Sequence, residues 1–227
     1  RHLLSILVFL PILGLVIILF VKSSQARAIR WVAFVTTAIE ALLTIYLYAI
    51  YEPIKGAFPA DRAFQFVEQA SWIPAFNIQY YIGVDGLSVI LLLLTGILSF
   101  LALFWAIPID KGVKGFHVLY LLLVTGMVGV FVALDLFLFY VFWEIMLLPM
   151  YFLIGVWGGP RREYAAIKFF IYTLVGSVLI LLVMLALYFK TASGDGPGTF
   201  SIPELIRLQP FADSAFWFQA VLFFALF

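Results

Sequence analysis

The 227-residue sequence contains no cysteine and only two histidines. The absence of cysteine excludes disulfide bonds, thiolate-bound iron–sulfur clusters and cysteine zinc sites. The two histidines, His2 and His117, are far apart, and neither has a second metal-ligating residue three or four positions further on. We therefore expect neither a haem nor a metal site in this chain.

Charged residues are also scarce, at 11% of the chain, whereas soluble domains contain about 25%. Hydrophobic residues make up 66% of the sequence. The formal net charge is +1 and there is no basic run, so nothing indicates a nucleic-acid partner. The composition predicts a protein that is solvated mainly by lipid.

Six apolar stretches are long enough to cross a bilayer as helices of about 20 residues. They are His2–Val21, Trp31–Tyr51, Val84–Ala106, Phe116–Leu134, Leu136–Trp157 and Ala165–Phe189. The first is longer than the apolar region of a signal peptide, so we expect it to be retained. A seventh stretch begins at Ala215 and is unfinished at Phe227, which predicts a piece of a longer polypeptide. Strand-like alternation is nearly absent, so we predict an all-α, polytopic transmembrane bundle over residues 1–227.

The distribution of Lys and Arg predicts how the spans are oriented. Eight of these residues lie in or next to the connections after spans one, three and five, counting Lys168 one turn into the sixth span, and four lie in the connections after spans two, four and six. The second group consists of Lys55, Arg62, Lys190 and Arg207. Because positively charged loops stay in the cytoplasm, we expect the N-terminus outside and the odd connections inside.

Glu144 is the only charged residue in the fifth span, Leu136–Trp157. A carboxylate inside a bilayer costs several kcal/mol or more, so intramembrane acids are usually functional. Burial also favours the protonated form of a carboxyl group. We therefore expect Glu144 to take part in proton translocation, with a static ion pair to another helix as the alternative.

Three neighbours of Glu144 on the same span are candidate supporting residues. Tyr140 and Tyr151 share its helical face and could hydrogen-bond the carboxylate or order water, or they could simply pack. Pro149 has no N–H group to donate to the carbonyl of Ile145. That carbonyl is left free and could bind water, and the proline could kink the helix locally. An architectural role for this proline is an equal alternative.

Other polar residues near the spans carry weaker expectations. Lys168 lies one turn into the sixth span, where it could snorkel to the interface or load protons near Glu144. Glu40, near the centre of the second span, could face another subunit or a hydrated cavity, and it ranks below Glu144. Asp85 is expected to cap the third span. Small residues should mediate helix contacts, namely Gly126, Gly129, Thr173, Gly176 and Ser177.

Three segments together resemble a known family. The stretch Tyr140–Gly159 (YVFWEIMLLPMYFLIGVWGG) is similar to the fifth-helix signature of the M subunit of respiratory complex I. Ala165–Ser177 (AAIKFFIYTLVGS) and the opening Gly83–Ser88 (GVDGLS) resemble the same subunit. That subunit is the bacterial counterpart of mitochondrial NADH dehydrogenase subunit 4.

The resemblance implies the N-terminal portion of an antiporter-like subunit with fourteen helices in two inverted repeats. It implies proton translocation driven by electron transfer from NADH to quinone elsewhere in a bacterial cytoplasmic-membrane complex. In this family the glutamate matching Glu144 pairs with a lysine on the seventh helix. No cofactor is implied in this chain, since NADH, FMN, iron–sulfur clusters and quinone belong to other subunits. The implied partners are the antiporter-like L and N subunits, lipids and protons.

Two other functions remain open from the sequence. An Mrp-type cation/proton antiporter subunit would also use a membrane glutamate. A passive membrane scaffold would hold its neighbours together and use Glu144 only for assembly. A membrane enzyme with its own active site would need a cluster of acid–base or metal-binding residues, which the sequence does not contain.

Overall fold

The computed structural model describes residues 2–52, 64–192 and 196–226. In this part of the chain six helices are long and apolar enough to cross a membrane. They are α1 (Leu3–Phe20), α2 (Ala26–Ile50), α3 (Gly86–Trp105), α4 (Val113–Val132), α5 (Leu136–Trp157) and α6 (Arg162–Thr191). Two shorter helices follow, α7 (Ile202–Leu208) and α8 (Phe216–Leu226). The predicted helical membrane fold is confirmed.

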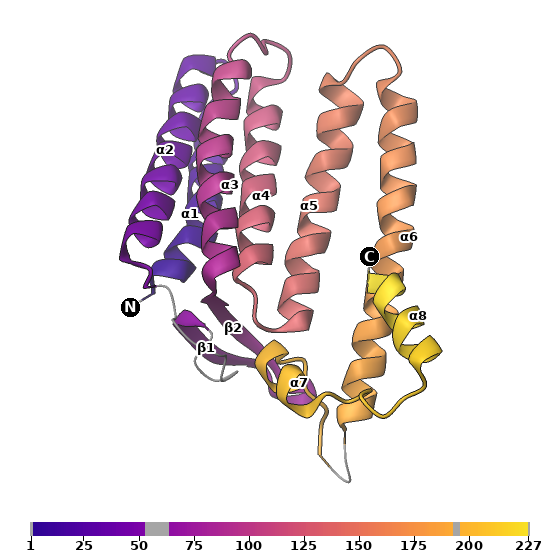
Figure 1. The fold of residues 1–227 in the computed structure, drawn as a ribbon. Coiled ribbons are helices and arrows are strands. Elements are labelled where there is room, and N and C mark those ends of the chain that lie inside the picture. Colours follow the sequence, from indigo (N-terminus) through magenta and orange to yellow (C-terminus); the bar gives the residue numbers. More distant parts are fainter. Residues whose placement is uncertain (1, 53–63, 193–195, 227) are drawn as a thin grey trace.

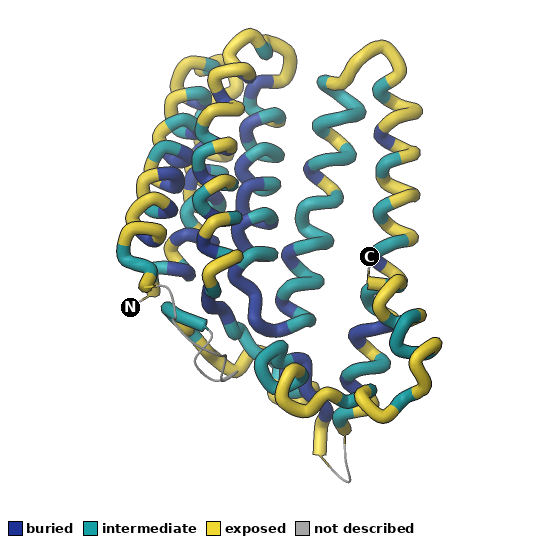
Figure 2. The backbone as a smooth tube through the Cα atoms, in the orientation of Figure 1, coloured by how far each residue is buried: buried dark blue, intermediate teal, exposed yellow. Residues whose placement is uncertain are grey.

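The long helices run up and down in chain order (Figure 1). Helices α1 to α4 form one group in which α1 contacts α2 and α4, and α2 contacts α3. Helix α5 packs against α4, and α6 packs against α5. Buried backbone positions concentrate in the first group, whereas α6 is exposed along much of its length (Figure 2). This arrangement places α5 between the four-helix group and α6.

Three spans begin before their apolar stretches. Helix α4 begins at Val113 rather than Phe116 and includes Lys114. Helix α2 begins at Ala26 and therefore includes Arg27 and Arg30, and α6 begins at Arg162. Long basic side chains can keep their charged ends in the aqueous interface while the backbone continues as helix. Span ends predicted from hydropathy alone are consequently too short at these positions.

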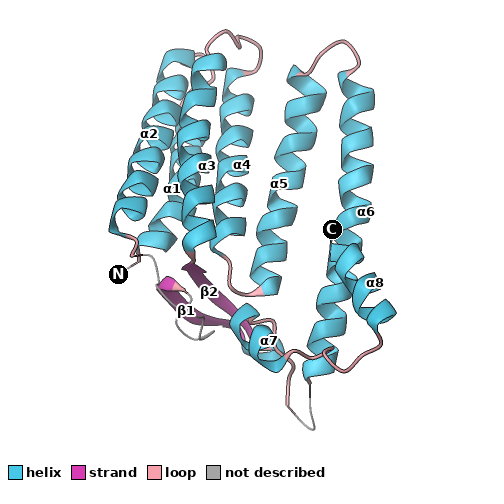
Figure 3. Cartoon of the chain, in the orientation of Figure 1, coloured by secondary structure: helices cyan, strands magenta, loops and turns pink. Residues whose placement is uncertain are grey.

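The connection between α2 and α3 contains a β-hairpin that the sequence analysis did not predict (Figure 3). Strand β1 (Gln65–Ile73) pairs antiparallel with β2 (Ile78–Val84) across a short 3₁₀ turn, η1 (Pro74–Phe76). Lys55 and Arg62, which entered the orientation count, lie outside the described residues. The hairpin joins the ends of helices rather than crossing the membrane with them.

The hairpin supplies a cap for helix α1. The Glu68 carboxylate on β1 accepts hydrogen bonds from the backbone N–H groups of Leu4 and Ser5 at 3.2 and 3.3 Å. These groups belong to the first turn of α1, where backbone donors have no partner within the helix. The N-terminus of α1 is therefore satisfied by a residue 64 positions away in sequence.

A second capping contact lies at the start of α5. Asp135 is fully buried, and its Oδ1 accepts from the backbone N–H groups of Phe137 and Leu138 at 2.9 and 3.1 Å. Its Oδ2 accepts from the backbone N–H of Gln79 on β2 at 3.2 Å. Burial raises the pKa of the Asp135 carboxyl, and the three backbone hydrogen bonds oppose that shift. One side chain thus connects the helix that carries Glu144 to the hairpin.

We expect Asp135→Ala to destabilise the α5 N-terminus by about 1–2 kcal/mol, because the cap is lost and buried N–H groups become unpaired. The matched control is Asp85→Ala at the N-cap of α3, where the expected Asp cap is confirmed and, among the described residues, accepts only from Ser88 at 2.7 Å. Amide hydrogen exchange in the full-length subunit would measure the loss of protection at the N-terminus of α5 or α3 in each variant. Equal protection losses in the two variants would contradict the connecting role of Asp135.

Candidate functional site

Helix α5 approaches α4 closely because α4 has glycine at the contact. A Cβ atom at Gly126 would meet Met146 and the backbone of Phe142, and one at Gly129 would meet the Phe142 ring. These contacts confirm the prediction that the two glycines mediate helix packing. Gly176 on α6 differs, since a Cβ atom there would meet nothing within 4 Å among the described residues. The prediction that Gly176 mediates a helix contact is therefore wrong for contacts with the described residues.

Glu144 lies in the first half of α5, between the residues that contact Gly129 and Gly126. Its side chain is half-buried, and its Oε1 is buried with no hydrogen-bond partner among the described residues. An unpaired buried carboxylate oxygen is costly, so this atom requires a proton, a water molecule or a cation. The geometry therefore leaves Glu144 ready to accept a partner from outside the described chain.

Tyr140 is the polar neighbour of Glu144 on the same helix. Its hydroxyl interacts with the Glu144 carboxylate and with the Ser177 hydroxyl on α6. Ser177 is 2% exposed and donates to the carbonyl of Leu174 at 3.0 Å. The three side chains form a polar contact between α5 and α6 at the level of Glu144.

Tyr151 and Pro149 take part in helix packing. The Tyr151 ring packs edge-on against Phe170 of α6, with the ring centroids 5.5 Å apart. Pro149 is buried inside α5, which continues as a single α-helix from Leu136 to Trp157. The structure thus places Tyr151 in the α5–α6 packing and shows no interruption of the helix at Pro149.

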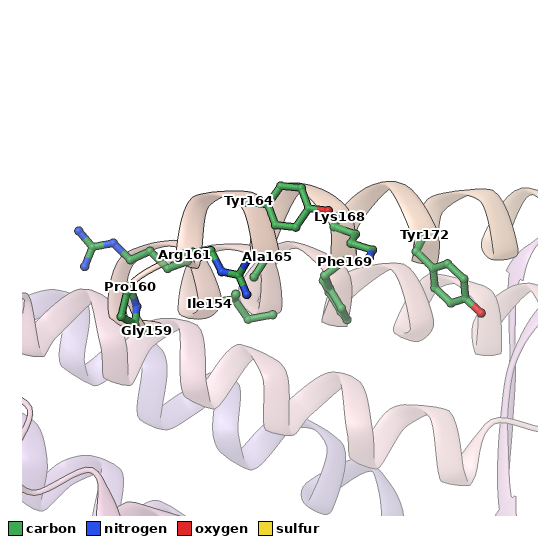
Figure 4. A pocket seen from close by; sticks show the side chains of 10 residues that line it. Ile154, Gly159, Pro160, Arg161, Tyr164, Ala165, Lys168, Phe169 and Tyr172 are labelled. Carbon is green, nitrogen blue, oxygen red and sulfur yellow. The ribbon is translucent and has the colours of Figure 1, made fainter.

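The structure does not bring Lys168 to Glu144. Lys168 is exposed, and its ammonium lies 5.9 Å from the centre of the Tyr164 ring. It lines an open groove along α6 with Tyr164, Phe169 and Tyr172 (Figure 4). Helical geometry puts it on the side of α6 opposite Phe170, which contacts α5. No ion pair of the described residues joins Lys168 to an acid.

Glu40 on α2 is more deeply buried than sequence reasoning suggested. Its side chain is 0% exposed, and neither carboxylate oxygen has a partner among the described residues. Hydropathy alone could place it in a span but could not show which way it points. Among the described residues, no group of three His, Cys, Asp or Glu side chains could hold a metal ion.

Comparison with known proteins gives this arrangement a family context. Residues 133–227, which include Asp135 and Glu144, match the transmembrane family described as NADH:quinone oxidoreductase/Mrp antiporter. The NADH-quinone oxidoreductase subunit M of Rhodobacter capsulatus is 38% identical over the whole of this chain, which covers 44% of that subunit. The chloroplastic NAD(P)H-quinone oxidoreductase chain 4 of Chlorokybus atmophyticus is 41% identical over 82% of this chain, which covers 35% of its length.

Solved structures share the fold. Respiratory complex I from Thermus thermophilus matches 90% of this chain and 39% of its own chain, with 26% identity and a TM-score of 0.74. The Mrp complex from Dietzia sp. DQ12-45-1b matches 98% of this chain and 22% of its own, with 18% identity and a TM-score of 0.70. The second likeness is one of fold alone.

Six membrane-crossing helices with an acid inside α5, in this family context, define an antiporter-like integral membrane protein. The chain is a homologue of NADH-quinone oxidoreductase subunit M, as the resemblance predicted. It spans less than half the length of the relatives that it matches. Those relatives are bacterial and chloroplastic.

Proposed function

We propose that this chain forms part of the proton-translocating, antiporter-like subunit of an NADH:quinone oxidoreductase. In this role it couples electron transfer from NADH to quinone to proton pumping across a bacterial cytoplasmic membrane. The observation that carries the proposal is the buried Oε1 of Glu144, which has no partner among the described residues. Relatives of this chain are subunits of NADH-quinone oxidoreductase. Glu144 is the residue that binds and releases the proton.

Proton binding at Glu144 changes the charge of the α4–α5–α6 contact. The ionised carboxylate accepts one proton and becomes neutral, which removes most of the cost of a charge in hydrocarbon. The Tyr140 hydroxyl can donate to the ionised form and accept from the protonated form, while it also interacts with Ser177. The hydrogen bonding between Tyr140 and Glu144 therefore differs between the two protonation states.

In the proposed function, the redox chemistry takes place in other subunits. NADH, FMN, iron–sulfur clusters and quinone bind there, and the antiporter-like L and N subunits lie next to this one in the membrane. The absence of cysteine from the sequence agrees with that division, because thiolates are the usual ligands of iron–sulfur clusters. Lys168 would then load protons from the cytoplasmic side or hold the α6 end at the interface.

A complementation experiment separates this function from that of an Mrp-type antiporter. The full-length subunit is restored to a strain that lacks it, and inverted membrane vesicles are supplied with NADH or with a sodium gradient. We expect NADH oxidation to drive proton uptake in sodium-free buffer. Sodium-dependent proton exchange with no response to NADH would overturn the proposal in favour of the antiporter.

A further inference from the structure

Glu40 is an acid at the centre of α2 that the proposed function does not use. Its side chain is 0% exposed, and both carboxylate oxygens are buried with no hydrogen-bond partner in the described chain. Thr36 and Thr44 lie one turn before and after it, and both are also buried. The three residues form a single polar stripe on one face of α2.

This stripe faces the interior of the four-helix group formed by α1 to α4. The Thr36 side chain lies over Gly14 of α1, and the Thr44 side chain lies over Gly96 of α3. Glu40 is between these two threonines on the same face, so it points between α1 and α3. The inner side of α2 is a row of buried positions in Figure 2.

The neighbouring hydroxyl protons are already used. Thr36 donates to the carbonyl of Val32 at 2.8 Å, and Thr44 donates to the carbonyl of Ala41 at 2.9 Å. Thr37, which is also buried, donates to the carbonyl of Ala33 at 3.1 Å. These hydroxyls keep oxygen lone pairs that can accept a hydrogen bond, but they have no proton left for a carboxylate.

No cation of the described residues neutralises Glu40. Helices α1 and α3 contain no charged residue, and on α2 the nearest cation is Arg30, which pairs with Asp110 at 2.8 Å. On α4, Lys114 donates to the carbonyls of Leu19 and Val21, both at 2.9 Å. The other titratable groups of α4 are also engaged, His117 with the carbonyl of Val113 and Tyr120 with that of Ser99.

An ionised Glu40 would therefore be a buried charge with neither a cation nor a donor, which is among the most costly arrangements in a protein. A protonated Glu40 carries no charge, and its O–H group needs only one acceptor. We propose that Glu40 is a second proton-binding site in the membrane, which holds a proton at neutral pH and exchanges it with water. On binding, the carboxylate takes up one proton and becomes a neutral carboxylic acid.

The proposed site is separate from Glu144. The glycines of α4 that pack on α5 are Gly126 and Gly129, whereas Glu40 lies within the group on the other side of α4. Two acids thus lie on opposite sides of one helix. A variant at either position tests its own site, so failure of this inference leaves the role of Glu144 untouched.

Infrared difference spectroscopy of the assembled complex tests the inference. We expect the wild-type minus Glu40→Gln spectrum at pH 7 to contain a carboxylic-acid C=O band that shifts when water is replaced by D₂O. The Glu144→Gln complex should keep this band. If Glu40→Gln does not assemble, Glu40→Asp should shift the band instead. Carboxylate bands in the difference spectrum, or a C=O band insensitive to D₂O, would overturn the proposal.

Discussion

Glu144→Gln is expected to abolish pumping-linked quinone reduction by NADH while the complex still assembles. Glutamine keeps the size and most of the polarity of the side chain, so the packing of α5 against α4 and α6 should persist. It cannot bind or release a proton near neutral pH, so the proposed transfer step is lost. Loss of a positioned proton-transfer group typically slows a reaction by about a hundredfold or more.

Two further variants make this result specific. Glu144→Asp keeps the carboxylic acid on a shorter side chain and should retain part of the activity. Glu163→Gln makes the same chemical change at an exposed position in the first turn of α6, and it should have no effect. NADH-dependent quinone reduction in membranes, with subunit content measured by native electrophoresis, distinguishes loss of activity from loss of assembly.

The passive-scaffold alternative predicts a different pattern. In that case Glu144 stabilises contacts with its neighbours, and Glu144→Gln would lower the amount of assembled complex. The complex that did assemble would then reduce quinone at the normal rate per molecule. That combination would exclude a role for Glu144 in proton transfer.

The second large effect is expected at the α4–α5 contact. Gly129→Ala should destabilise the subunit by about 1–3 kcal/mol, because the new methyl group overlaps the buried Phe142 ring. Alanine is a better helix former than glycine by about 1 kcal/mol, so the packing term must outweigh this gain. Thermal unfolding of the solubilised full-length subunit or its complex measures the difference.

Gly115 provides the matched control on the same helix. A Cβ atom there would lie 3.7 Å from the Trp157 ring, which is ordinary contact, so Gly115→Ala should be neutral or stabilising. Combining Gly129→Ala with Phe142→Leu should recover part of the lost stability, since the overlapping ring is removed. Equal unfolding temperatures for Gly129→Ala and Gly115→Ala would contradict the close packing of α5 on α4.

The spans were predictable because hydrophobic length is a local property of the sequence. The fifth span, Leu136–Trp157, agrees with α5 at both ends. The hairpin was not predictable in the same way. Its strand β2 (Ile78–Val84) has its last three residues buried, and its pairing is fixed by β1, η1 and the α5 cap rather than by alternation.

The candidate site shows the same division. A lone acid in an apolar span identified Glu144, and helical spacing placed Tyr140 beside it. The direction of Lys168 depends on which face of α6 packs against α5, which sequence spacing within one helix does not reveal. The burial of Glu40 depends in turn on how closely α1 and α3 approach α2, where Gly14 and Gly96 lie against Thr36 and Thr44.

The most direct test of the account is the number of protons translocated per NADH oxidised, measured in proteoliposomes that contain the complex with Glu144→Gln. We predict that any NADH oxidation that remains in this variant moves no protons through the subunit, so the ratio falls below that of wild type. The Glu163→Gln complex should keep the wild-type ratio. Pumping at the wild-type ratio by the Glu144→Gln complex would contradict the central claim.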